Sequence, residues 1–518
     1  MSTTIEKTST LQSTLHSVID SAEFQTVLAQ IRGGARVVSI SGLVAEPARA
    51  LLVAAMQRET GKQFALVVPA QRDLESWQRD VRFWYCALHG ISDCEEAVAV
   101  LPASESDPYA GGSPHAETLE RRALALWRLA RTRPNVVLLT SRALARRTVA
   151  PPAILKAGAM LLRDEDHPPE ELVDKLIAAG YVREDPVGAV GEFSMRGGIL
   201  DVWPPGRDAP GRIEFFGDTV DSIREFDPET QLSTTQLTQI EIPPMRELIV
   251  RTAEFREWAS HARMRWRDER FARSLRDRTI YADEGESFPG WEWLISLGRE
   301  NDATTFDYLK DAVLVVDEPV AVETYLSQAF QTVADRYAET DAVDDLGLRP
   351  EELYLTPEEL RAQIDRNQRV EFRVLGRTAA KIDQELALDA EQPKISVGKE
   401  RAEKRPLFLF PNVSVPGAVV TSSTSRGSHD PVAIAPGTDT AEIDFKAQSV
   451  MRYHGRIPDL ARDVIDRHGN GATTLFVMPS TGVAERVAEI LREYEVNARL
   501  TSFEDDSAAA PADASRIQ

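Results

Sequence analysis

Short unbroken runs of apolar residues recur along the first part of the chain, and helical patterns lie between them. The runs fall at 35–43, 63–70 and 95–102, with a fourth at the start of 135–147. Between the first two, residues 47–60 have the composition of a helix. Continuous apolar runs are typical of strands buried on both faces, and their alternation with helices favours a parallel sheet covered by helices. We therefore predict an α/β multidomain protein, in which residues 1–152 form the first half of a parallel-sheet domain.

The pattern changes over residues 153–240. Residues 168–180 begin with prolines and acidic residues and end in glycine, which are start and stop signals of a helix. Three strands are expected next, separated by turns rich in glycine and proline: 193–204, 212–218 and 219–227. Their close spacing predicts an antiparallel meander. We expect a small α+β domain here, inserted between two halves of the first domain.

A buried run at 311–319 resumes the first pattern, so residues 241–345 are predicted to complete the first domain. A third α/β domain is expected over 346–503. Its predicted elements are a helix at 356–367, a strand at 472–479, a helix at 481–495 and a strand at 496–503.

Two further segments lack the pattern of packed structure. Residues 422–440 are rich in serine, glycine and proline, so we interpret them as a mobile loop. Residues 504–518 contain too few apolar residues to fold, and we expect a flexible linker to something beyond this chain.

Charge and cysteine content narrow the class of protein. The 518 residues carry a net charge of -22, whereas a protein that wraps duplex DNA with its whole surface is normally basic. Nucleic-acid contact is therefore expected to be local or to belong to another part. Cys86 and Cys94 form no CxxC pair, and the chain has no signal-like or membrane-spanning apolar run. These features predict a cytoplasmic protein without a membrane partner.

The turn after the first predicted strand has the position of a phosphate-binding loop but not its residues. Such a loop needs glycines for the phosphates, a lysine, and a serine or threonine for magnesium. Residues 41–49 contain one glycine, Gly42, while Glu46 and Pro47 occupy the turn. A carboxylate repels a triphosphate, and proline removes an amide donor. Asp317 and Glu318 follow an apolar strand as a magnesium motif does, but without a phosphate loop we interpret them as a strand end.

Other catalytic patterns are also absent from the sequence. The eight histidines form no HExxH pair, and no GxSxG elbow occurs. We therefore predict no catalytic residue, cofactor or metal in this chain.

The predicted strand at 212–218 suggests a docking surface for a protein. Alternation places Ile213 and Phe215 on one face, and Arg212, Glu214 and Phe216 on the other. An aromatic residue between charged ones on a solvated sheet is typical of an interface. Arg196, followed by two glycines that permit a bulge or close approach, is expected beside Arg212. Two alternatives remain: pairing of Arg196 with Asp201 or Glu214, and coverage of Phe216 by another domain.

Residues 251–278 suggest a rival function. This segment has nine arginines together with Trp258 and Trp266, a mixture that can follow a phosphate backbone. The alternative is an amphipathic helix with a solvated charged face, because acidic residues are interspersed.

A family resemblance extends over the chain to about Pro319. The stretch Gly191–Gln231 resembles the partner-binding domain shared by the excinuclease protein UvrB and the transcription-repair coupling factor family (Mfd). Flanking pieces agree in order: 101–122, 136–147, 287–294 and 306–319. UvrB has an intact phosphate loop and a long aromatic hairpin, whereas here the hairpin region Asp107–Glu120 is short, with Tyr109 as its only aromatic. Both losses point to the coupling factor family, and residues from about Leu346 resemble its third domain.

This resemblance implies specific expectations, among them that the parallel-sheet domain is of the helicase-like class. Arg196, Arg212 and Phe216 match the positions that contact the excinuclease protein UvrA. The chain is expected to be an N-terminal fragment that recruits UvrA to RNA polymerase stalled at DNA lesions and contributes to autoinhibition. RNA polymerase, double-stranded DNA, ATP and magnesium would bind absent domains of an ATP-dependent translocase that releases the polymerase and couples transcription to nucleotide excision repair. The alternatives are a UvrB-like helicase fragment with ATPase activity and a nucleic-acid-binding module.

Overall fold

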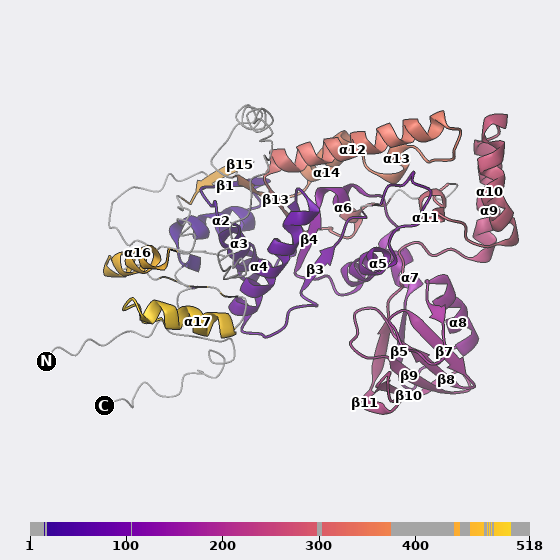
Figure 1. The fold of residues 1–518 in the computed structure, drawn as a ribbon, viewed down its shortest axis with the longest axis horizontal. Coiled ribbons are helices and arrows are strands. Elements are labelled where there is room, and N and C mark those ends of the chain that lie inside the picture. The colour runs from indigo at the N-terminus through magenta and orange to yellow at the C-terminus, as the bar shows by residue number, and fades with distance from the viewer. Residues whose placement is uncertain are drawn as a thin grey trace, which may run out of the picture.

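A seven-stranded parallel sheet forms the centre of the first domain in this computed structural model (Figure 1). Residues 18–104, 106–297, 303–373, 440–445, 456–470 and 481–498 are described, with single positions 15, 474, 476 and 478. The strand order is β15-β1-β14-β13-β2-β4-β3. In chain order the strands are β1 (Val37–Ser41), β2 (Phe64–Val68), β3 (Val98–Leu101), β4 (Val136–Thr140), β13 (Val313–Asp317), β14 (Arg369–Arg373) and β15 (Thr440–Asp444).

Alternate residues of the central strands enter two separate cores. Leu66, Leu138 and Val315 face one core, while their neighbours Val67 and Leu139 face the other. The first core is covered by α2 (Ala22–Arg32), α3 (Glu46–Thr60) and α4 (Gln71–His89). The second is covered by α5 (Ala116–Arg131), α6 (Ser141–Ala145), α7 (Pro151–Ala157), α12 (Pro319–Ala342) and α14 (Pro357–Arg366). Burial on both faces explains the unbroken apolar runs and confirms the predicted α/β class.

Residues 159–242 form the inserted unit, because the chain leaves the parallel sheet after β4 and returns at β13. An antiparallel pair, β5 (Ala159–Leu162) and β12 (Gln239–Ile242), closes its entry and exit. Helix α8 (Pro169–Ala178) packs against a sheet of order β11-β10-β9-β8-β7-β6. Its strands are β6 (Val182–Arg183), β7 (Glu192–Arg196), β8 (Ile199–Val202), β9 (Gly211–Phe216), β10 (Thr219–Phe226) and β11 (Ser233–Leu237). Figure 1 shows this unit at one end of the molecule.

The meander has more strands than the three predicted. The predicted strand 193–204 is a hairpin, because Gly197 and Gly198 form a two-residue turn between Arg196 and Ile199. Gly197 has φ 59°, a left-handed conformation that glycine adopts without strain. Sheet edges β6 and β11 were missed because they are short or polar, with sequences VR and STTQL.

The boundary predicted near Leu346 does not coincide with an edge of the parallel sheet. Strand β14 lies between β1 and β13, and β15 pairs with β1, so both belong to the first sheet. The sequence of β14, RVEFR, concealed its buried position because a charged residue stands at its centre. Glu371 there is buried and accepts hydrogen bonds from Arg369 Nε at 2.7 Å and Arg373 Nη2 at 2.6 Å.

A helical region follows the inserted unit. It comprises α9 (Thr252–Arg265), η1 (Glu269–Phe271), α10 (Ala272–Glu284), α11 (Trp291–Leu294), η2 (Thr305–Asp307) and α13 (Pro350–Leu353). Its own apolar core includes Trp258, Trp266 and Trp291. Helices α9 and α10 pack together as a hairpin at the end of the molecule opposite α16 and α17 (Figure 1).

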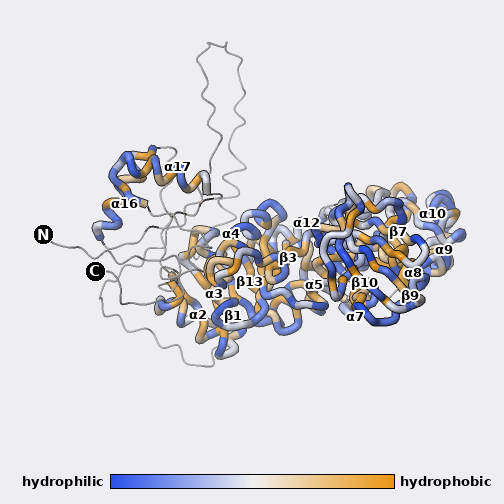
Figure 2. Tube along the Cα trace, turned by 90° about the horizontal axis from the view of Figure 1, so that it is seen from below, coloured by the Kyte–Doolittle hydropathy of each residue, from blue (hydrophilic) through white to orange (hydrophobic). Residues whose placement is uncertain are grey.

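Two amphipathic helices follow β15: α16 (Ile457–Gly469) and α17 (Thr481–Arg492). Ala461 and Val464 of α16 share a small core with Leu491 of α17, and Figure 2 shows both helices alternating between polar and apolar residues. The predicted loop up to residue 439 and the tail 504–518 lie outside the described residues, as do most positions of the strands expected at 472–479 and 496–503.

Candidate functional site

The outer face of β9 carries the exposed aromatic side chain that the sequence pattern predicted. Ile213 is fully buried and Phe215 partly buried against the α8 core. Phe216, at the end of the strand, is 84% exposed. The predicted alternation of faces along β9 is therefore confirmed, and no other domain within the described residues covers Phe216.

Arg196 and Arg212 meet at a shared carboxylate, Asp201. Arg212 donates from Nε and Nη2 to the two Asp201 oxygens, at 2.7 and 2.9 Å. Arg196 Nη2 donates to Asp201 Oδ2 at 3.0 Å, and Arg196 Nη1 pairs with Asp185 Oδ1 at 3.2 Å. The Asp201 side chain is only 2% exposed, whereas that of Arg196 is 51% exposed. Asp201 is thus a buried anchor that holds two arginines at the surface of the sheet.

Other contacts fix the position of Arg212. Its Nη1 donates to the Gln231 carbonyl at 3.2 Å, and its guanidinium lies 4.5 Å from the centre of the Phe226 ring. The hydrogen bond to Asp201 raises the pKa of Arg212 above its usual range. A guanidinium held in this way loses little side-chain entropy when a partner arrives.

Ile199 belongs to the same face, although the sequence pattern did not identify it. It lies opposite Glu214 on β9 and opposite Arg196 on β7, and paired residues of an antiparallel ladder project to the same side. Its side chain is 37% exposed. Ile199 could have been identified if Gly197–Gly198 had been recognised as a two-residue hairpin turn, because that turn sets the register of Ile199. We call Arg196, Ile199, Arg212 and Phe216 the outer-face patch.

The turn that resembles a degenerate phosphate loop is occupied by an ion pair. Arg49 of α3 is buried and pairs with Asp317 at the end of β13. Trp77 Nε1 donates to the second Asp317 oxygen at 3.2 Å, and the Arg49 guanidinium lies 5.4 Å from the Trp77 ring centre. We call Arg49, Trp77 and Asp317 the closed cluster. The Asp317 carboxylate is thus paired with a cation of the same chain. In a nucleotide site, a carboxylate at this position would instead be available to bind magnesium.

Burial dominates the electrostatics of the closed cluster. Desolvation raises the pKa of Asp317 to about 7, supported by Glu318 and Glu46 and opposed by Arg49 and Trp77. A group of three or more histidine, cysteine or acidic residues arranged to hold a metal does not occur among the described residues. Cys86 and Cys94 are buried free thiols. In the part of the chain that the structure describes, helices long and apolar enough to cross a membrane are absent.

The arginine-rich segment has the contacts of a charged helical surface. Trp258 and Trp266 are both buried, so neither is available to stack on a base. Many of the arginines are paired within the chain: Arg263 with Asp283, Arg265 with Glu352, Arg270 with Asp341 and Asp344, and Arg278 with Asp345. These contacts favour the amphipathic alternative over a nucleic-acid site.

Tyr109, from the region compared with the UvrB hairpin, also faces inward. Its hydroxyl donates to the Leu348 carbonyl at 2.7 Å, and its ring centre lies 5.7 Å from that of Tyr337. The side chain therefore fastens a loop to the helical region.

Comparisons with known proteins agree with these features. Residues 160–248 match the family model described as the UvrB interaction domain. The transcription-repair-coupling factor of Myxococcus xanthus is 33% identical over 286 residues, covering 53% of this chain and 23% of that protein. That of Haemophilus influenzae is 30% identical over 315 residues, covering 59% of this chain and 26% of that protein.

The Bacillus subtilis transcription-repair-coupling factor is 33% identical over 238 residues, which is 45% of this chain and 19% of that protein. The matched part therefore spans about a quarter or less of the length of these relatives. The outer-face patch lies inside the matched domain. The resemblance drawn from the sequence is confirmed: this chain carries a UvrB interaction domain within a longer segment similar to transcription-repair-coupling factors.

Proposed function

We propose that the outer-face patch recruits the excinuclease protein UvrA. The observation that carries this proposal is Phe216, which is 84% exposed on the strand face that also bears Arg212, where Arg196 and Arg212 are anchored on a buried carboxylate, within a UvrB interaction domain. Exposed aromatic and arginine side chains held rigidly are the usual centres of protein interfaces. Ile199 extends the apolar part of the patch between Arg196 and Glu214.

The whole protein, of which this chain resembles a part, would connect this recruitment to transcription. RNA polymerase and double-stranded DNA would bind other domains, and an ATP-dependent translocase there would release the stalled polymerase. In the resting cytoplasmic protein, a further domain would cover the outer-face patch as an autoinhibitory contact. Support for this wider role comes from the name that the relatives share, transcription-repair-coupling factor.

Within this wider role, the present chain acts by binding rather than by hydrolysis. The Arg49–Asp317 pair supports this view because it removes the carboxylate that a nucleotide site would need for magnesium. The corresponding test is an ATPase assay on the chain with and without duplex DNA. We expect background rates in both cases, and robust turnover would contradict this part of the proposal.

Calorimetric titration of purified UvrA into the chain tests the docking surface. Single changes Arg196→Ala, Arg212→Ala and Phe216→Ala should each weaken binding by about 1–4 kcal/mol, as truncations at interface anchors do. Ile199→Ala should have a smaller effect in the same direction. The matched control is Ile177→Ala, because Ile177 is exposed on α8 of the same domain, outside the patch.

The pattern of affinities decides the outcome. Unchanged affinity in all three main variants, with the fold intact by circular dichroism, would refute the docking assignment. Equal losses in the Ile177→Ala control would also refute it, because they would indicate a general disturbance of the domain.

A further inference from the structure

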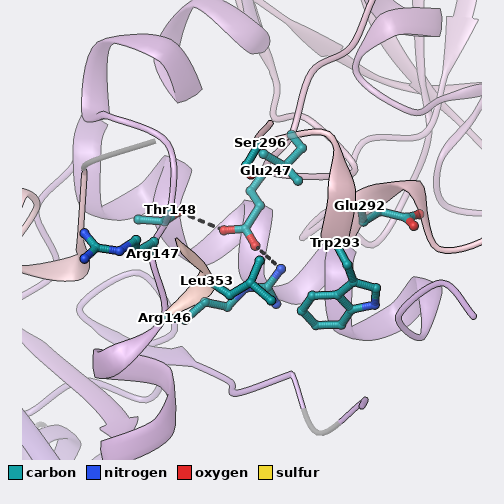
Figure 3. Close-up of a pocket in the computed structure, with 9 residues that line it drawn as sticks. Arg146, Arg147, Thr148, Glu247, Glu292, Trp293, Ser296 and Leu353 are labelled. Atoms are coloured by element: carbon teal, nitrogen blue, oxygen red, sulfur yellow. Dashed lines mark hydrogen bonds and ion pairs between the residues drawn. The ribbon is translucent and has the colours of Figure 1, made fainter. Parts of the chain in front are cut away.

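A second feature lies where the inserted unit rejoins the parallel-sheet domain. A small pocket opens there, and its walls include Arg146, Thr148, Glu247, Glu292, Trp293 and Leu353 (Figure 3). It offers about 20 Å³, a little more than a single water needs. The outer-face patch and the closed cluster contribute none of its lining residues.

Among the residues that line the pocket, Glu247 has hydrogen-bond or ion-pair partners for both of its carboxylate oxygens. Its Oε1 accepts from Arg122 Nε and lies 3.2 Å from Arg146 Nη2. Its Oε2 accepts from Arg122 Nη2 at 3.3 Å and from Thr148 Oγ1 at 2.8 Å. Burial acts to raise the pKa of Glu247, but the two arginines and the hydrogen bonds lower it to about 2. Glu247 is therefore a carboxylate with no capacity left for another cation.

Arg146, in contrast, has a buried nitrogen without a hydrogen-bond partner in the part of the chain that the structure describes. Its side chain is 7% exposed, and its Nη1 has no hydrogen-bond partner among the described residues. The guanidinium carbon lies 4.9 Å from the centre of the Trp293 ring. The adjacent backbone is fixed, since Leu355 N donates to the Ala145 carbonyl and Arg147 N to the Leu353 carbonyl. A buried donor left unpaired is unfavourable, so this nitrogen requires an acceptor.

The charges around the pocket specify the kind of acceptor. Arg122 and Arg146 face one carboxylate, Glu247, and nearby Arg142 adds to the positive field on Arg146. Arg147 is balanced separately by Glu359 at 3.3 Å. The Glu292 carboxylate, which accepts a hydrogen bond from Ser113 Oγ at 2.7 Å, offsets the charge of Arg246. An anion would neutralise this positive excess, whereas a water molecule would only satisfy the donor.

We propose that this pocket binds one monovalent anion of halide size, such as chloride, hydrogen-bonded to Arg146 Nη1. The small volume excludes a phosphate, and the unpaired Nη1 donor of a positively charged group excludes a cation. The bound anion completes the joint formed by Arg122, Glu247 and Arg146, and so links the exit of the inserted unit to α5 and to the segment after α6.

Crystals of the chain grown in sodium bromide give the direct test. We expect an anomalous peak at the bromine edge within hydrogen-bond distance of Arg146 Nη1. A pocket that refines as water alone, in data that show bromide elsewhere, would overturn the proposal. This result stands even if no pocket variant folds.

Thermal denaturation in solution gives an independent measurement. Sodium chloride, sodium acetate and sodium gluconate are compared at equal ionic strength. Chloride should raise the melting temperature by about 2 °C with saturation, as binding to the folded state alone requires. Arg146→Lys should remove the saturable part, and the control Arg267→Lys, at an exposed arginine without an ion pair among the described residues, should retain it.

The measurements in acetate distinguish a site for a halide ion from a site for a carboxylate. A saturable response to acetate but not to chloride would overturn the halide assignment and identify a carboxylate site. Equal responses in all three salts, or in the Arg146→Lys variant, would also overturn it, because they would indicate general screening.

Discussion

The outer-face patch and the closed cluster are built from the same parts but differ in what they leave at the surface. Each has an arginine, an aspartate at a strand position and an aromatic ring beside the guanidinium: Arg212, Asp201 and Phe226 in one, and Arg49, Asp317 and Trp77 in the other. In the closed cluster all three side chains are buried. At the outer-face patch the anchor Asp201 and the ring of Phe226 are buried, while Arg196 and Phe216 are exposed.

This difference shows that an arginine–aspartate pair has no fixed role. At the end of β13 the pair is enclosed together with the ring of Trp77. In the inserted unit it acts as a support, because Asp201 positions two guanidinium groups toward solvent. The distinguishing property is therefore the exposure of the neighbours rather than the pair itself, and substitutions in the two regions should separate these roles.

The largest effect on folding is expected at the closed cluster. Arg49→Met should lower the free energy of unfolding by about 3–5 kcal/mol, because it leaves Asp317 buried without its cation. Urea denaturation measures this loss. The double change Arg49→Met with Asp317→Leu should recover most of it, and neither variant should alter the affinity for UvrA. A large loss of affinity would show that the cluster and the patch are coupled.

A smaller effect is expected at the anchor of the patch. Asp201→Asn should lower stability by about 1–3 kcal/mol, since it weakens charge-assisted hydrogen bonds to Arg196 and Arg212. It should also weaken UvrA binding about tenfold, although Asp201 itself is buried, because the arginines lose their positions. The control is Asp185→Asn at the exposed partner of Arg196, which should change stability by less than about 1 kcal/mol. Normal binding by Asp201→Asn would mean that the anchor is dispensable.

The pH dependence of stability should reveal the closed cluster. With the pKa of Asp317 raised to about 7, the folded chain retains a proton that the unfolded chain releases near its ordinary value of 3.8. The contribution of this group therefore decreases as pH rises from about 4 to about 7, by at most about 1.4 kcal/mol per pH unit. Urea titrations at several pH values should show that Asp317→Asn loses this component. An identical pH profile in the variant would contradict it.

The smallest effects are expected on the arginine-rich hairpin. Arg267 and Arg276 are exposed and have no ion pair among the described residues, so Arg267→Ala and Arg276→Ala should change stability by less than about 0.5 kcal/mol. The chain should also fail to shift labelled duplex DNA. A salt-sensitive shift that these two changes abolish would restore the nucleic-acid alternative.

The sequence predicted those features that depend on local periodicity. The buried strands, the inserted unit and the outward position of Phe216 all follow from patterns of two or about four residues. The lack of a phosphate-loop motif could also be recognised from neighbouring residues alone, namely Gly42, Glu46 and Pro47. The residues expected to contact UvrA came from a family resemblance, and that contact remains a prediction.

Features that depend on distant pairing were missed. Strand β14 pairs with β1, which lies more than 300 residues earlier in the chain. The alternating charged residues of β14 also do not have the pattern of a buried strand. Pairing of Arg49 with Asp317 spans 268 positions, and the pairing of Arg122 with Glu247 spans 125. Such contacts are set by topology, and periodicity in a single sequence has no information about them. Ile199 was missed for a smaller reason, because its face depends on recognising a two-residue turn.

The place of β14 in the sheet has a consequence for how the chain acquires its structure during synthesis. Strand β1 contacts the rest of the sheet through β14, which is made more than 300 residues later. Until residues 369–373 leave the ribosome, the strand that joins β1 to β13 in the sheet is missing. The inserted unit, whose strand pairs all fall within residues 159–242, has every partner available much earlier. The domain that carries the outer-face patch can therefore complete its fold while the sheet from which it projects still lacks a central strand.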